Sequence, residues 1–101
     1  MFTYSLTISL EPQAETEWLE YMKQEHIPAI IETGYFDEIS VAQIVEPASD
    51  DHSVSYNIQC VAGTMEHLRL YMAKEAPRIH GKHDKTFAKR FHAVDALLKD
   101  L

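Results

Sequence analysis

Two stretches of this 101-residue chain repeat one another at a spacing of about fifty positions, and this repeat limits the folds that the chain can adopt. Tyr21-Met22 corresponds to Tyr71-Met72 in the second copy, and Pro28 corresponds to Pro77. Two copies of a strand–helix–strand unit are too few for a solenoid, which needs about three repeats. They are enough for one split βαβ sheet with both helices on the same face. We therefore predict a single α+β domain over residues 1–101, a ferredoxin-like βαββαβ sandwich with a four-stranded antiparallel sheet.

Alternating apolar and polar side chains mark three strands. Residues 2–10 alternate without interruption, and the segment 53–62 alternates as far as Cys60. A period of two over such a length is typical of a strand. The segment from Tyr35 to Glu46 is predicted as a further strand, and the polar turn at residues 47–51 indicates an antiparallel hairpin with the strand that follows.

The last strand is predicted from the repeat, against the local pattern. Apolar residues from Phe87 to Leu101 keep helical spacing, but a split βαβ sheet needs a fourth strand. We assign this strand to residues 90–98, after a short helical or irregular segment near 80–88.

Two helices are predicted between the strands. The first spans residues 13–32 with a distortion near Ile27, because Pro28 removes a backbone hydrogen bond and clashes with the preceding turn. Gly34 supplies a C-terminal stop. The second starts at Thr64, a favourable N-cap, and Ala76-Pro77 is expected to disturb its end.

Charge and hydropathy exclude several classes of partner. The net charge of −7 argues against a nucleic-acid partner, since phosphates repel an acidic surface. No apolar run approaches the ~20 residues that a membrane helix needs, so no membrane partner is expected. The N-terminus lacks the features of a signal peptide. Cys60 is the single cysteine and is interpreted as a small buried hydrophobe, which fits a cytoplasmic location.

The charges and the sheet face raise the question of self-association. Residues 1–60 carry one cation and eleven carboxylates, whereas residues 61–101 carry eight cations and five carboxylates. The halves can pair within one chain, which we prefer, or across a dimer. The sheet face away from the helices carries small uncharged side chains, whereas a solvated face more often carries Lys and Glu. We expect a homodimer through this face, which is made by Thr3, Ser5, Thr7, Ser9, Ser55, Asn57 and Gln59.

The chain resembles a small bacterial family, domain of unknown function 4286. The resemblance covers nearly the whole chain and is carried by Trp18-Leu19-x-x-Met22-Lys23-x-x-His26-Ile27-Pro28, Thr33-Gly34-x-Phe36, Tyr4-Ser5-Leu6-Thr7-Ile8, Ala76-Pro77-Arg78, Phe87 and Arg90-Phe91. It implies the dimeric α/β-barrel, ferredoxin-like superfamily and brings no established activity. That superfamily includes cofactor-independent monooxygenases, haem-degrading enzymes and isomerases, several with a pocket between helices and sheet.

His26 is the candidate catalytic residue. Imidazole is the usual proton shuttle near neutral pH, and some superfamily members place a histidine before a proline-bearing helix end, as His26-Ile27-Pro28 does. The alternative, which we prefer, is a structural histidine that hydrogen-bonds a carbonyl freed by Pro28.

A hydrophobic small-molecule pocket is the second candidate. Its lining is assigned to Trp18, Met22, Tyr56, Tyr71 and Met72, with Arg78 or Arg90 as a grip for an anionic group. The same apolar residues equally make a core, and the same arginines equally pair with the acidic first helix. We prefer these interpretations.

The His80-Gly81-Lys82-His83 segment is interpreted as a solvated loop, not a metal site, because a metal needs three or four convergent ligands. No metal or cofactor is expected. Two functions remain open: a non-catalytic, ligand-sensing dimer, or a cofactor-independent oxygenase or isomerase with His26 as acid or base.

Overall fold

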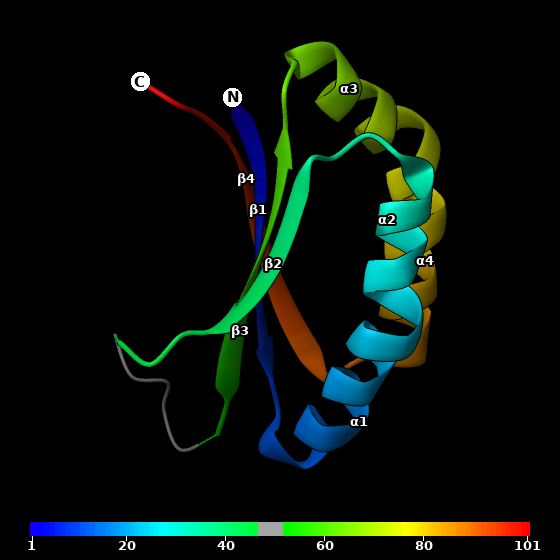
Figure 1. Cartoon of the computed structure of the whole chain (residues 1–101). Helices are drawn as coiled ribbons and strands as arrows, with labels where there is room; N and C mark the ends of the chain where they lie inside the picture. Colours follow the sequence, from blue (N-terminus) through cyan, green and yellow to red (C-terminus); the bar gives the residue numbers. More distant parts are fainter. Residues whose placement is uncertain (47–51) are drawn as a thin grey trace.

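The computed structural model describes residues 1–46 and 52–101 (Figure 1). The first half contains β1 (Phe2–Leu10), a 3₁₀ turn (Pro12–Ala14), α1 (Glu15–Tyr21), the π-helical segment η2 (Met22–His26), α2 (Ile27–Thr33) and β2 (Glu38–Gln43). The second half contains β3 (Val54–Ala62), α3 (Met65–Leu70), the π-helical segment η3 (Tyr71–Glu75), α4 (Ala76–Thr86) and β4 (Phe91–Lys99).

The strands form one antiparallel sheet in the order β2-β3-β1-β4. The helices cover one face of this sheet and leave the other uncovered (Figure 1). This arrangement confirms the predicted ferredoxin-like sandwich, including the strands at 2–10, 53–62 and 90–98. The turn predicted at 47–51 lies outside the described residues.

Register divides each strand between the two faces. Leu6 of β1 lies between Ile58 of β3 and Asp95 of β4, and these three side chains point towards the helices. The next position, Thr7, lies between Asn57 and Val94 on the uncovered face. Because successive side chains alternate across a sheet, the predicted polar set from Thr3 to Ser9 shares the uncovered face with Ser55, Asn57 and Gln59.

Both helical arms widen into a π turn directly before their proline. The N–H of Ile27 bonds the carbonyl of Met22, and the N–H of Ala76 bonds that of Tyr71, each five residues back. Proline lacks an N–H and its ring crowds the carbonyl four residues earlier, so a wider turn relieves the clash without ending the helix. The distortion predicted near Ile27 is therefore confirmed.

Three sequence predictions need correction. The strand predicted for 35–46 is shorter, because Tyr35 and Phe36 pack against the core from the loop before β2. The second helix does not end at Pro77, since proline is tolerated in the first turn of α4. Of the helical and irregular alternatives for the segment near 80–88, the helix is present as far as Thr86. His80 to His83 therefore form part of α4, not the predicted loop.

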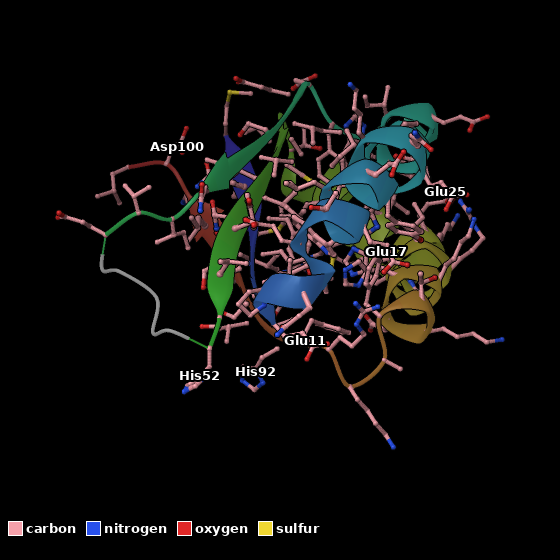
Figure 2. All side chains as sticks on the ribbon, turned by 90° about the horizontal axis from the view of Figure 1, so that it is seen from below. Glu11, Glu17, Glu25, His52, His92 and Asp100 are labelled. Carbon is pink, nitrogen blue, oxygen red and sulfur yellow. The ribbon has the colours of Figure 1, made fainter. Side chains whose placement is uncertain are left out.

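Ion pairs within the chain join its acidic first half to its basic second half. Arg90 bonds Glu11 and Glu17 at 3.0 Å each, and Lys82 approaches Glu25 at 3.3 Å. Figure 2 labels the three glutamates. Arg78 instead pairs with Glu75 on its own helical arm, so its predicted pairing with the first helix is wrong. Within residues 1–46 and 52–101, no helix is long and apolar enough to cross a bilayer.

Candidate functional site

His26 is turned towards the sheet by the π segment in which it lies. Trp18, Met22, His26 and Ile30 recur every four residues and are each at most 3% exposed. Four residues of α-helix turn ~400°, so a straight helix would carry this row ~40° off the sheet at every step. The wider turn at Met22–His26 absorbs the extra residue and keeps the imidazole facing inward.

Both ring nitrogens of His26 are buried and have no hydrogen-bond partner among the described residues. The preferred interpretation of this side chain, as a cap on a carbonyl freed by Pro28, is therefore wrong. An unpaired buried polar group costs roughly 1–3 kcal/mol. The position thus carries a cost that packing alone does not explain.

His26 lines a cavity of about 140 Å³ between α4 and the β1–β4 side of the sheet. The floor comes from Tyr4, Leu6 and Ile8 of β1 and from Phe91, Ala93 and Asp95 of β4, and the wall comes from His26, His80, His83 and Asp84. The imidazole of His26 stacks on His80 at 5.9 Å and meets His83 edge-on at 5.4 Å, measured between ring centres.

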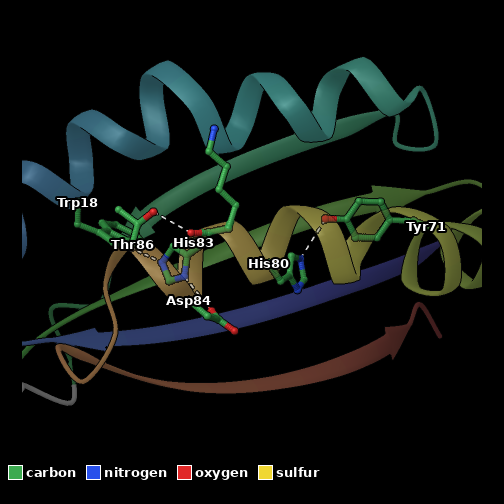
Figure 3. A network of polar contacts seen from close by, with 7 residues as sticks. Trp18, Tyr71, His80, His83, Asp84 and Thr86 are labelled. Atoms are coloured by element: carbon green, nitrogen blue, oxygen red, sulfur yellow. Dashed lines mark hydrogen bonds and ion pairs between the residues drawn. The ribbon is translucent and has the colours of Figure 1, made fainter.

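Hydrogen bonds fix the tautomer of His83. The indole Nε1 of Trp18 donates to Nε2 of His83 at 2.8 Å, and Nδ1 of His83 lies 3.0 Å from Oδ1 of Asp84 (Figure 3). An indole N–H only donates, so Nε2 must be the acceptor and Nδ1 must carry the proton that faces Asp84. Both nitrogens of His83 are therefore engaged, unlike those of His26.

Two tyrosines hold the other end of the cavity. The Tyr71 hydroxyl and His80 Nε2 share a hydrogen bond of 3.0 Å (Figure 3), and the Tyr4 hydroxyl donates to Oδ2 of Asp95 at 3.0 Å. Burial, with the bond to Asp95, raises the pKa of Tyr4, so this hydroxyl remains a donor at neutral pH. The stacking of Tyr4 on His80 at 5.6 Å completes this end.

The environment of His26 keeps its imidazole neutral. Burial lowers its pKa to about 3, and the neighbouring His83 and His80 rings act in the same direction. A neutral imidazole has one donor and one acceptor nitrogen. The two unpaired nitrogens of His26 are therefore one donor and one acceptor.

The residues assigned to a pocket from the sequence lie elsewhere. Trp18, Met22, Tyr56 and Tyr71 belong to the main core, and Met72 packs partly buried against it. Trp18 and Tyr71 touch the site through the bonds that orient His83 and His80. Arg78 lines a second hollow of about 270 Å³, which His26 also borders, together with Glu25 and Lys82.

His80, His83 and Asp84 were missed as site residues by sequence reasoning. A signal for His83 existed, because Ala76, Ile79, His83 and Phe87 continue one helical stripe at spacings of three and four. All four are buried, and His83 is 2% exposed. The interpretation of this segment as a solvated loop is wrong.

Within the described ranges, no group of three or more His, Cys, Asp or Glu side chains has the geometry to hold a metal ion.

The fold and the cavity between its two layers define a ferredoxin-like α+β protein. Solved structures of this kind are similar to the chain along its whole length. An ethyl tert-butyl ether d (EthD) family protein from Bacillus halodurans C-125 has a TM-score of 0.67 at 15% identity, and the alignment covers 100% of both chains. A dimeric ferredoxin-like protein from an uncultured marine organism has a TM-score of 0.66 at 10% identity, over 100% of this chain and 95% of that one.

A third similar structure is SnoaB, a cofactor-independent oxygenase from Streptomyces nogalater, with a TM-score of 0.64 at 9% identity over 98% of this chain and 92% of that one. None of the curated proteins compared with the chain matches it. The chain belongs to the family described as Domain of unknown function (DUF4286), whose model matches residues 1–101. The resemblance noted in the sequence is thereby confirmed.

Proposed function

We propose that this protein binds a small organic molecule in the cavity between α4 and the β1–β4 half of the sheet. The observation that carries the proposal is His26, which is 3% exposed, lines the cavity and has two buried nitrogens that meet no partner in the described part of the chain. A ligand that hydrogen-bonds one of these nitrogens would supply a partner that the described residues do not. Binding would thus remove a cost that the free protein bears.

The size of the cavity limits the ligand. A cavity of about 150 Å³ holds benzene, and this one measures about 140 Å³. The floor at Leu6, Ile8 and Ala93 is apolar, whereas the polar atoms lie on the helix side and at the Asp95 end. This division suits a compact molecule with one apolar side.

A catalytic role for His26 is the alternative. One protein with a similar fold is named as a cofactor-independent oxygenase, and this similarity is the support for the alternative. A general base works best when its pKa lies near the working pH, and that of His26 is lowered to about 3. The imidazole is therefore better suited to hydrogen-bonding a ligand than to taking up a proton.

The proposal is tested by fragment binding read at the ring of His26. Histidine-labelled protein is titrated with a library of benzene-sized polar fragments, and the ring signals of all six histidines are followed by NMR. We expect a subset of fragments to shift His26, His80 and His83 together and to leave the exposed His67 unchanged.

His26→Phe and His67→Gln are the matched variants. Phenylalanine keeps the ring but removes both nitrogens, so binding should be lost in His26→Phe and kept in His67→Gln. If no fragment moves the His26 signal, or if His26→Phe binds as the wild type does, the proposed function is wrong.

We also propose that the protein is a homodimer through the uncovered sheet face. Among the described strand residues of that face there is one carboxylate, Glu38, and no Lys or Arg. The amide of Asn57 donates to Ser5 at 3.0 Å and to Thr7 at 3.2 Å, so polar groups are paired within the face. Burying paired polar groups costs less than burying unpaired ones. Similarity to a protein named as dimeric supports the same assembly.

A further inference from the structure

The polar groups at the cavity accept more hydrogen bonds than they donate. The carboxylates of Asp84 and Asp95 line it, and no Lys or Arg within residues 1–46 and 52–101 does so. The Tyr4 hydroxyl already donates to Asp95, and the Nδ1 proton of His83 already faces Asp84. A carboxylate accepts about four hydrogen bonds, so both retain capacity. His26 adds a buried nitrogen that accepts.

The charges of Asp84 and Asp95 influence the pKa of His80, which also lines the cavity. Burial lowers the pKa of His80, and the charges of Asp84 and Asp95 oppose that shift. His80 lies on α4, Asp84 one helical turn further on, and Asp95 below on β4. Figure 3 shows His80 and Asp84 directed from α4 towards the sheet. The two carboxylates therefore make the electrostatic potential at the cavity wall more negative.

Polarity also changes along the sheet. Asp95 pairs in register with Leu6, and Ala93 pairs with Ile8 one step further along. The strand residues of the cavity change from polar at Tyr4 and Asp95 to apolar at Ile8, Ala93 and Phe91, while Asp84 borders the cavity from α4. A ligand that fits both ends has a donating head and an apolar body.

We propose that the ligand is a small amphipathic amine, with its ammonium group at the carboxylates of Asp84 and Asp95 that line the cavity, and its apolar body over Leu6, Ile8 and Ala93. An ammonium group has three N–H donors and no acceptor, which matches a cavity whose charged side chains are both carboxylates. This inference rests on the proposed function, since it names the ligand class of the same cavity.

The test compares three compounds of nearly one size: cyclopentylamine, cyclopentanol and cyclobutanecarboxylate. They are titrated at about pH 7.5, where an alkyl amine is protonated as lysine is, and the ring signals of His26 and His80 are followed by NMR. We expect the amine to bind about tenfold more tightly than the alcohol, in line with charge-assisted hydrogen bonds. The carboxylate should not bind.

Conservative variants locate the charge. Asp95→Asn keeps an oxygen that accepts from Tyr4, and Asp84→Asn keeps one that accepts from His83, so the fold should survive both. Each should weaken amine binding about threefold to fivefold, as expected for a partly exposed charge pair, and leave alcohol binding unchanged. Asp100→Asn is the control, because Asp100 lies beyond β4, does not line the cavity and pairs with the N-terminal amine.

The outcomes separate the two proposals. If the alcohol or the carboxylate binds as tightly as the amine, the amine inference is overturned and the binding function stands. Equal loss of amine affinity in Asp100→Asn and Asp95→Asn also overturns it, because the effect would then be general electrostatics. If none of the three compounds moves the His26 signal while other fragments do, the amine class is wrong. If nothing binds at all, both proposals fail.

Discussion

The indole nitrogen of Trp18 and the Nε2 atom of His83 are joined by a buried hydrogen bond of 2.8 Å across 65 positions of sequence. This bond ties the first helical arm to the second at the wall of the cavity. It also forces the proton of His83 onto Nδ1, towards Asp84. One contact therefore joins the packing of the two arms to the chemistry of the candidate site.

Trp18→Phe should destabilise the protein by about 2–4 kcal/mol, because it leaves Nε2 of His83 unpaired and opens a small void. Trp18 is fully buried, so neither loss can be repaired by water from outside. Urea denaturation at 25 °C measures the change. A double-mutant cycle with His83→Leu should show a coupling of about 1 kcal/mol or more. Additive losses in that cycle would show that the hydrogen bond contributes little.

His26→Phe should flatten the loss of stability on acidification. Burial lowers the folded pKa of His26 from 6.5 to about 3. The unfolded chain therefore takes up this proton first as the pH falls through 6.5, and stability present above that pH is lost progressively towards pH 3. The lost share between pH 7 and pH 5 is about 2 kcal/mol.

The measurement is urea denaturation of wild type and variant at pH 7, 6 and 5. The pKa of His80 is also lowered, chiefly by burial, but His80 is present in both proteins, as are the carboxylates, so only the His26 share differs. His67→Gln should follow the wild type. An identical decline in His26→Phe would mean that His26 is not held neutral.

Cys60 should resist thiol reagents in the folded protein. The side chain is 1% exposed on β3, and burial raises the pKa of the thiol to about 12. The thiolate is the reactive form, so modification requires opening of the sheet. We expect labelling by an aromatic disulfide reagent at about pH 8 to be slower on the order of a thousandfold in native than in urea-unfolded protein. Comparable rates in the two states would contradict the burial of Cys60.

Much of the fold follows from sequence patterns that a single physical cause produces. The alternation at residues 2–10 matches β1 at both ends, because one face of that strand is buried and the other is not. The last strand is the instructive case. Its apolar residues keep helical spacing from Phe91 onward, yet the segment pairs along its whole length with β1. The need of the sheet for a fourth strand prevailed over the local pattern.

The site could be predicted only in part. His26 stood out because it precedes a proline, but its unpaired nitrogens depend on what packs around them. Pro77 suggested the end of a helix, and this concealed the continuation of α4 that buries His83. The cavity itself is invisible in the sequence, because Leu6 and Ile8 would be apolar whether they faced a void or a packed side chain. The void depends on how far α4 stands from the edge strand.

The two glycines of the helical layer should respond oppositely to alanine. Gly34 closes α2 with φ at 76°, a left-handed conformation that costs a residue with a Cβ atom about 1 kcal/mol or more. Gly81 lies inside α4, where an added Cβ meets no atom within 4 Å. Gly34→Ala should therefore destabilise by about 1 kcal/mol and Gly81→Ala should stabilise by about 0.5–1 kcal/mol. Chemical denaturation measures both, and the same sign for the two would contradict the assigned backbone.

Val94→Asp should weaken the proposed homodimer. Val94 of β4 is 64% exposed in the single protomer and lies on the uncovered face, where Thr7 is its partner in register. A carboxylate at this position would lose its hydration on assembly, and two copies would bring like charges into one interface, so we expect a loss in dimer affinity of at least about a hundredfold.

Ile31→Asp is the matched control, because Ile31 is equally exposed, at 61%, but lies on the helical layer. Light scattering after size-exclusion chromatography, over a range of protein concentrations, gives the mass of each variant. The wild type and Ile31→Asp should elute as dimers and Val94→Asp as a monomer with an unchanged circular dichroism spectrum. A monomeric wild type would leave the paired, nearly uncharged face without a partner and overturn the proposed assembly. Dissociation by Ile31→Asp, with Val94→Asp remaining dimeric, would move the interface to the helical side.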